Sequence, residues 1–117
     1  MGDPLLHITT GQAWQTAEAH GAYRADSLTT EGFIHCSTAK QVAAVAEALY
    51  PGRTDLILLI IDPKRVTADI RYEDCYASGQ AFPHVCGPIP LDAVVRILAY
   101  RPAPDGRFPW PFLTSGQ

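Results

Sequence analysis

The stretch Asp55-Leu56-Ile57-Leu58-Leu59-Ile60-Ile61 decides the fold class of this chain of 117 residues. Its continuous leucine and isoleucine run is too short for most helices and does not alternate with polar residues. Such a run predicts a central strand that is buried on both of its faces. Pro51-Gly52 ends the preceding element, and Asp62-Pro63 turns the chain after the strand.

A strand and a helix are expected at the start of the chain. The strand covers 5–8 and surrounds His7 with apolar residues. Thr9 or Thr10 can cap the following helix, and Gly21 ends it. The helix is expected to carry these residues inward: Ala13, Trp14, Ala17 and Ala19. Residues 22–30 show little periodicity and are expected to form an irregular connection.

A second strand and helix are expected before the central strand. A short buried strand is predicted at Phe33-Ile34. Thr38 and Gln41 form a capping-box pattern at the start of a helix over 39–50. The apolar positions of this helix follow helical spacing: Val42, Val45, Ala46 and Leu49.

Strands dominate the remainder of the chain. A half-buried strand is expected to point Ile70, Tyr72 and Cys75 inward, and a final strand is expected over 94–100. The two prolines in 82–88 favour an edge segment or a loop that lines a site. The tail over 101–117 is rich in proline and is expected to wrap the surface, held by three aromatic residues: Phe108, Trp110 and Phe112.

This order of elements predicts an α+β fold in which two helices of the N-terminal half are segregated from a mainly antiparallel sheet. A doubly wound parallel sheet is disfavoured because strands and helices stop alternating after the central strand, and no glycine-rich phosphate loop is present. The length suits one domain over 1–117. The chain shows no membrane-spanning run or signal-peptide pattern, so a cytoplasmic protein is expected.

Charge and cysteine content restrict the ligands that the protein can be expected to bind. The net charge is −3, and the nine lysines and arginines are scattered, which disfavours a long nucleic acid as partner. A compact anion needs only one or two basic groups and backbone donors, so it remains possible. The three cysteines do not form a C-x-x-C pair, which favours reduced thiols over a disulfide framework.

Potentially reactive side chains gather in 31–38, where a strand ends and a helix begins. His35 and Ser37 are expected on one face and Cys36 on the other, because neighbouring strand residues alternate. Cys36 is therefore interpreted as a small buried apolar residue. A nucleophilic triad with Cys36 or Ser37 is a weak alternative, since Ser37 is also explained by helix capping.

Several other polar residues can be explained either by a structural role or by a functional one. His7 is expected at the edge of the core, bonded to a backbone carbonyl. Glu73 suits an exposed strand carboxylate. His84 and Cys86, together with His35, permit a metal site as an alternative, although such sites usually contain tight local ligand pairs.

The ordered motifs of the sequence resemble those of the bacterial family catalogued as domain of unknown function 952. They extend over nearly the whole chain: Leu6-His7-Ile8-Thr9, Trp14, Tyr23, Asp26-Ser27-Leu28, Glu31-Gly32-Phe33-Ile34-His35-Cys36-Ser37, Tyr72-Glu73 and Phe82-Pro83-His84-Val85-Cys86-Gly87-Pro88. Some members carry the label glutathione S-transferase-like. Nothing in these residues resembles a thioredoxin fold that binds glutathione.

The family is in turn similar to ADP-ribosyltransferases, which hold NAD in the cleft of a split β-sheet. This resemblance implies NAD as cofactor and His7, Thr9, Ser27 and Ser37 as cofactor-binding residues, with His7 on a ribose hydroxyl. It implies His35, Glu73 and His84 as catalytic residues, because a carboxylate such as Glu73 would stabilise positive charge on the ribose. The late Glu-x-Glu or Gln-x-Glu element of those enzymes is absent from this sequence.

The residues and the resemblance together are consistent with three functions. The first is an ADP-ribosyltransferase-like domain that binds NAD or a related small anionic nucleotide. The second is a non-enzymatic module on the same fold that binds a small ligand or a protein. The third is metal-assisted hydrolysis.

Overall fold

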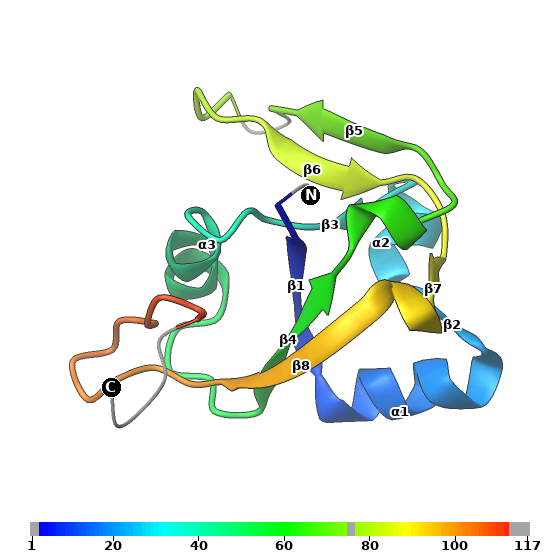
Figure 1. Ribbon diagram of the computed structural model, residues 1–117. Helices are drawn as coiled ribbons and strands as arrows, with labels where there is room; N and C mark the ends of the chain where they lie inside the picture. The colour runs from blue at the N-terminus through cyan, green and yellow to red at the C-terminus, as the bar shows by residue number, and fades with distance from the viewer. Residues whose placement is uncertain (1–2, 75–76, 113–117) are drawn as a thin grey trace.

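The computed structural model describes residues 3–74 and 77–112 and is built around a three-stranded antiparallel sheet (Figure 1). Strand β4 (Leu56–Ile61) lies between β1 (Leu5–Thr10) and β8 (Val94–Tyr100). The central strand predicted from the leucine and isoleucine run is therefore confirmed, and the predicted final strand is confirmed as well.

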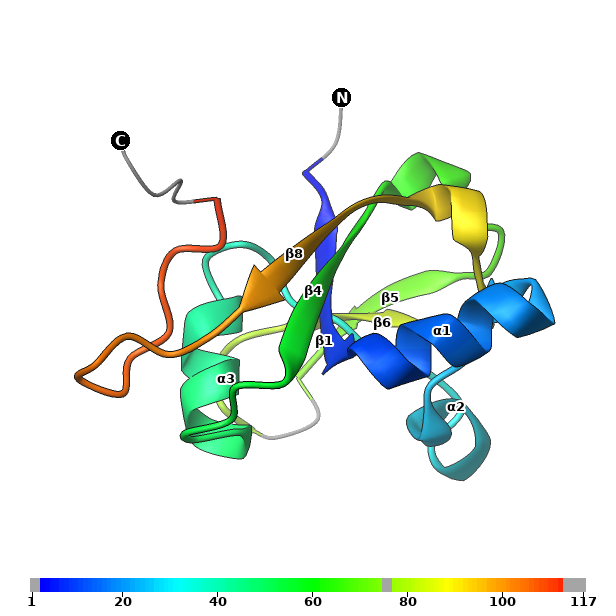
Figure 2. The same cartoon turned by 90° about the horizontal axis from the view of Figure 1, so that it is seen from below.

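Strand β4 separates two apolar cores, which explains why its sequence does not alternate with polar residues. Leu59 and Ile61 pack in a first core with Ala17 of helix α1 (Gly11–His20). Leu58 packs in a second core with Val42 of helix α3 (Val42–Leu49). Figure 2 shows α1 and α3 on opposite sides of this sheet.

Two smaller antiparallel sheets complete the fold. One pairs β2 (Ala22–Tyr23) with β7 (Ile89–Pro90), and the other has the order β3 (Ile34–His35), β6 (Phe82–Val85), β5 (Ile70–Glu73). Leu6 of β1 and Ser37 exchange two backbone hydrogen bonds of 2.8 Å. This bridge fixes the end of β3 beside the central sheet.

The α+β class with antiparallel sheets and few helices is confirmed. Besides α1 and α3, the described residues contain a short helix α2 (Asp26–Thr30) and two 3₁₀ helices, η1 (Pro63–Arg65) and η2 (Leu91–Ala93). The expectation of two helices in the N-terminal half thus missed α2. Within the described part of the chain, no helix has the length and apolarity required to cross a membrane.

The limits of α1 agree with its predicted caps. The Thr10 hydroxyl accepts a hydrogen bond from the Ala13 N–H at 3.1 Å, and Gly21 ends the helix with a φ of 83°. A positive φ is a conformation that glycine adopts without a steric penalty. Ala19, which was expected to point inward, is exposed because the core-facing side of α1 centres on Ala17.

Two predictions between 22 and 50 need correction. The segment 22–30 is not irregular, because it contains β2 and α2, which are too short to show a periodic pattern. Helix α3 begins at Val42 instead of residue 39. Gln41 Oε1 does accept the Thr38 N–H at 3.1 Å, so half of the expected capping box forms.

Strand β6 is also a correction, because the sequence predicted an edge segment or loop over 82–88. The strand lies in the middle of its sheet despite Pro83. The Pro83 carbonyl accepts the Cys36 N–H at 3.0 Å. Strand β3 ends at His35, so its ladder stops at the position where the missing N–H of Pro83 would have donated.

The half-buried strand predicted near Ile70 is only partly correct. Ile70 packs against the first core, but the Tyr72 side chain is 59% exposed. Tyr72 lies two residues further along β5 and packs in neither core. Cys75 lies outside the described residues.

The tail after β8 is held by one of its three expected aromatic anchors. Phe108 is buried in the second core with Tyr100. Trp110 and Phe112 are exposed to 49% and 36%, so they do not share that role. The Tyr100 hydroxyl adds a 2.8 Å hydrogen bond to the Pro109 carbonyl.

The close packing of Gly87, two residues after β6, can be tested by substitution. A Cβ at this position would lie 2.8 Å from the Cβ of Ala68, so Gly87→Ala is expected to destabilise the protein by about 1–3 kcal/mol. Gly11→Ala is the matched control, because its Cβ would meet nothing within 4 Å and alanine favours the helix. Urea denaturation of both variants measures the difference. Equal stability of the two variants would show that the segments around Ala68 and Gly87 move apart without cost.

Candidate functional site

A cavity of about 650 Å³ lies between β1, β2, α2, β3 and α3. Its volume is typical of small-molecule sites. Five of the seven predicted site residues line it: His7, Thr9, Ser27, His35 and Ser37. Glu73 and His84 are not among the lining residues. The Leu6–Ser37 bridge explains the grouping, because it brings the end of β3 against β1.

His7 lies on the wall of the cavity with both ring nitrogens engaged. Nδ1 is 2.6 Å from the His35 carbonyl oxygen, and Nε2 is 2.8 Å from the Tyr23 hydroxyl. Burial lowers the pKa of His7 from 6.5 to about 4, although the hydrogen bond to His35 opposes this change. The predicted histidine at the core edge, bonded to a backbone carbonyl, is therefore confirmed.

Tyr23 connects His7 to a second polar side chain of the cavity wall. Its hydroxyl lies 3.0 Å from Thr9 Oγ1, and its ring meets that of His7 edge to face at 5.0 Å between centroids. Burial raises the pKa of Tyr23. The result is a continuous hydrogen-bonded chain that runs from Thr9 through Tyr23 and His7 to the backbone of β3.

The His35 side chain is partly exposed and pairs with Glu31. Its Nε2 lies 3.1 Å and 3.2 Å from the two carboxylate oxygens of Glu31. The two side chains are 33% and 49% exposed. An imidazole and a carboxylate thus stand together where β3 meets the cavity.

Cys36 and Ser37 differ in chemical character although both are buried and line the cavity. Burial raises the pKa of the Cys36 thiol to about 12, so the thiolate required of a nucleophile does not form near neutral pH. The interpretation of Cys36 as a small buried residue is confirmed. The Ser37 backbone is hydrogen-bonded to Leu6, and the residue is part of the cavity lining.

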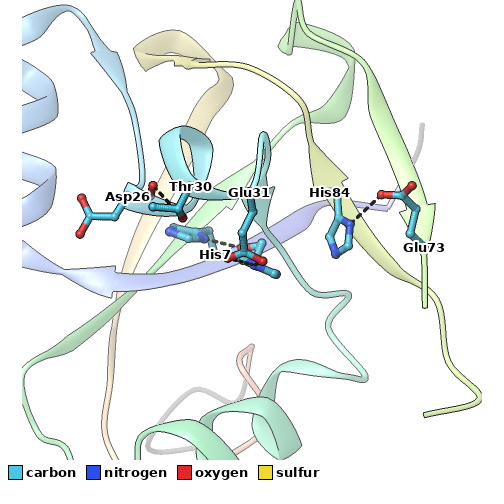
Figure 3. A network of polar contacts seen from close by, with 7 residues as sticks. His7, Asp26, Thr30, Glu31, Glu73 and His84 are labelled. Atoms are coloured by element: carbon cyan, nitrogen blue, oxygen red, sulfur yellow. Dashed lines mark hydrogen bonds and ion pairs between the residues drawn. The ribbon is translucent and has the colours of Figure 1, made fainter. Parts of the chain in front are cut away.

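His84 and Glu73 form a separate pair on the β5–β6 sheet (Figure 3). His84 Nδ1 lies 3.0 Å from Glu73 Oε1, and the His84 ring is fully buried and stacked on Phe33 at 4.0 Å between centroids. The His35 ring lies 5.3 Å from it. The structure therefore brings the three predicted catalytic residues near one another, but only His35 lines the cavity.

The metal alternative depends on a cluster of His, Cys, Asp or Glu side chains. In the part of the chain that the structure describes, no group of three such residues is arranged to hold a metal ion. Cys86 Sγ instead lies 3.9 Å from the His84 carbonyl oxygen.

Sequence reasoning did not include the cationic side chains of the cavity. Arg24 and Arg53 both line it. Arg53 already forms two 2.7 Å hydrogen bonds with the Asp55 carboxylate. Arg24 has no hydrogen bond or ion pair with any described residue. The sequence did offer one indication that Arg24 could line a site: it follows Tyr23 in a segment without periodicity, and such segments often line sites.

The cavity also has an apolar wall that the helical pattern did not reveal. Leu49 was expected to face the core, but its side chain is 64% exposed and lines the cavity with Val45 of the same helix. The two residues lie four apart, so they share one face of α3. The cavity therefore combines a polar wall on β1 with an apolar wall on α3.

Comparison with known proteins agrees with this fold. The crystal structure of protein CC0527 from Caulobacter crescentus is similar with a TM-score of 0.79, at 25% sequence identity over 91% of this chain and 93% of that chain. The solution NMR structure of CC0527 gives a TM-score of 0.76, at 26% identity over 94% and 92% of the two chains. None of the curated proteins matches the sequence. Residues 8–97 match the model of a family described as a protein of unknown function (DUF952), and the chain therefore belongs to the DUF952 family.

Proposed function

We propose that the cavity binds a small anionic nucleotide, with NAD or a related compound as the candidate ligand. The observation that carries this proposal is Arg24, an exposed residue that lines the cavity of about 650 Å³ and whose guanidinium has no ion pair with any described residue. A phosphate is a natural partner for such a group, because guanidinium donors match its oxygens in pairs.

The remaining lining favours a nucleotide over a simple anion. The Asp26 carboxylate and the hydroxyls of Thr9, Ser27 and Ser37 offer hydrogen-bonding groups for a sugar. The apolar wall of Val45 and Leu49 offers contact for a planar ring. A nucleotide contains all three components: a phosphate, a sugar with hydroxyls, and an aromatic base.

The geometry favours binding more strongly than catalysis. Two of the three predicted catalytic residues, Glu73 and His84, do not line the cavity, and His7 is buried with both ring nitrogens engaged. The ADP-ribosyltransferase-like assignment and the breaking of a nicotinamide–ribose bond thus rest on resemblance alone. A non-enzymatic binding module on the same fold is the second candidate, and the buried, doubly bonded His7 favours it.

Calorimetric titration of the protein with NAD, ADP-ribose, nicotinamide and a 2′-phosphorylated nucleotide tests the proposal. Arg24→Ala is expected to weaken binding of the phosphorylated ligands at least about tenfold, because hydrogen bonds to charged groups contribute about 1.5–3 kcal/mol. Nicotinamide, which has no phosphate, should be affected much less.

Arg71→Ala is the matched control for this titration. Arg71 is an exposed arginine on β5 and does not line the cavity, so its removal changes the net charge equally without touching the site. Affinity should stay within about twofold of the wild type, since distant surface charges are screened. Equal losses in both variants, or no binding at millimolar ligand, would contradict the nucleotide proposal.

A further inference from the structure

We propose that the hydrogen-bonded chain Thr9–Tyr23–His7 has a fixed direction that makes Thr9 an acceptor toward the cavity. It would then select a ligand that presents an O–H or N–H donor at that wall. The inference rests on the proposed nucleotide function and specifies it further. It assigns a sugar hydroxyl, and not a phosphate oxygen, to the Thr9 end of the cavity.

The direction of the chain is set at the backbone of β3. The His35 carbonyl can only accept a hydrogen bond, so the 2.6 Å contact requires that His7 Nδ1 carries the proton. A neutral imidazole has one N–H, which leaves Nε2 as an acceptor. The burial of His7 favours this neutral form.

Tyr23 must then donate to His7. Its hydroxyl has one hydrogen, and the contact with Nε2 is 2.8 Å. If that hydrogen pointed to Thr9 instead, His7 Nε2 would lose its donor in a buried environment. A buried group left without its hydrogen bond costs about 1–3 kcal/mol, which disfavours that arrangement.

Thr9 is the last member of the chain and is left as an acceptor. The two hydroxyl oxygens lie 3.0 Å apart, a contact in which either hydroxyl can be the donor. Because the single Tyr23 hydrogen is used for His7, we infer that Thr9 is the donor in this contact. Thr9 has no other side-chain hydrogen bond with a described residue. Its remaining lone pairs accept hydrogen bonds, and the residue lines the cavity.

This direction of the hydrogen bonds distinguishes ligand groups that donate a hydrogen bond from groups that only accept one. A sugar hydroxyl can donate to Thr9, whereas a phosphate or ether oxygen would place lone pairs against lone pairs. A site built to accept from a substrate hydroxyl discriminates strongly against analogues that lack it. Arg24 would hold the anionic part of the same ligand.

The tautomer of His7 tests the direction of the hydrogen-bonded chain without any ligand. Long-range proton–nitrogen NMR spectra at neutral pH distinguish a protonated ring nitrogen from an unprotonated one. The expected result is a protonated Nδ1 and an unprotonated Nε2 in His7. A protonated Nε2 would overturn the proposed direction.

The ligand class is tested with AMP and its 2′- and 3′-fluoro analogues, in which fluorine keeps the approximate size of a hydroxyl but cannot donate. One fluoro analogue is expected to bind at least about tenfold more weakly than AMP, as a lost donor to a buried acceptor predicts. Thr9→Val should reduce this difference to about twofold, because valine keeps the shape but removes the acceptor.

Two further variants separate the effect of the hydrogen-bonded chain from a general structural effect. Tyr23→Phe should also reduce the preference for AMP over the fluoro analogue, since Thr9 then no longer donates to Tyr23. Tyr72→Phe, the same change on exposed β5, should retain it. If AMP and both analogues bind equally well, the proposed direction of the hydrogen-bonded chain is wrong, while the nucleotide function stands. If none of the three binds, the nucleotide function itself is wrong, and the ligand class is overturned with it.

Discussion

Replacing Phe108 with alanine is expected to lower the free energy of unfolding by about 3–5 kcal/mol, the range for truncating a buried phenylalanine. Phe108 is 4% exposed, and its ring lies 5.1 Å from that of Tyr100 in the second core. Its backbone N–H also donates to Glu47 Oε2 at 3.0 Å, which ties the tail to helix α3. Urea denaturation followed by circular dichroism measures the loss.

Phe112→Ala is the matched control, because it removes the same side chain from the same tail. Phe112 is 36% exposed and is not part of either core. Its removal is expected to change the stability by less than about 1 kcal/mol, as for most surface substitutions. Similar losses in the two variants would contradict the assignment of Phe108, and not Phe112, as an aromatic anchor of the tail.

Acidification is expected to destabilise the protein through His7. The pKa of His7 is lowered from 6.5 to about 4 by burial, so the folded state binds fewer protons than the unfolded state between these values. The stability that His7 contributes is therefore fully present above about pH 6.5 and is lost progressively as the pH falls to about 4. The total loss corresponds to about 3 kcal/mol.

Urea denaturation at a series of pH values between 7.5 and 4 measures this dependence. In His7→Gln the stability is expected to fall less over the same range, because the titrating group is absent, even if the variant is less stable at neutral pH. His20→Gln is the control, since His20 is exposed at the end of α1 and should leave the dependence unchanged. Parallel curves for wild type and His7→Gln would show that His7 is protonated in the folded protein without penalty.

Local sequence patterns predicted the elements whose residues carry their own structural signal. The run over 56–61 identified β4, and Thr10 and Gly21 identified the ends of α1. The burial of Cys36 was predicted as well, but its expected separation from His35 and Ser37 was not found, because all three residues line the cavity. These features depend on the residue types and their spacing within one segment, so they can be recognised without knowledge of the rest of the chain.

Predictions failed where a partner distant in the sequence decides the outcome. Pro83 argues against a central strand, but β3 ends beside it and makes the missing N–H harmless. Leu49 follows the helical pattern of a core residue, yet the core contacts of α3 are made by Val42 and Ala46. The segment with Tyr23 and Arg24 has no periodicity, so its contribution to the cavity could not be read from the sequence.

By itself, the sequence determined the α+β class, the family and five of the residues that line the cavity. Only the tertiary structure decided that Glu73 and His84 lie outside that lining and that Tyr23 links His7 to Thr9. The physical reason is that hydrophobic periodicity and capping act between near neighbours in sequence. A site arises from strand pairings such as Leu6 with Ser37, which join segments far apart in the chain.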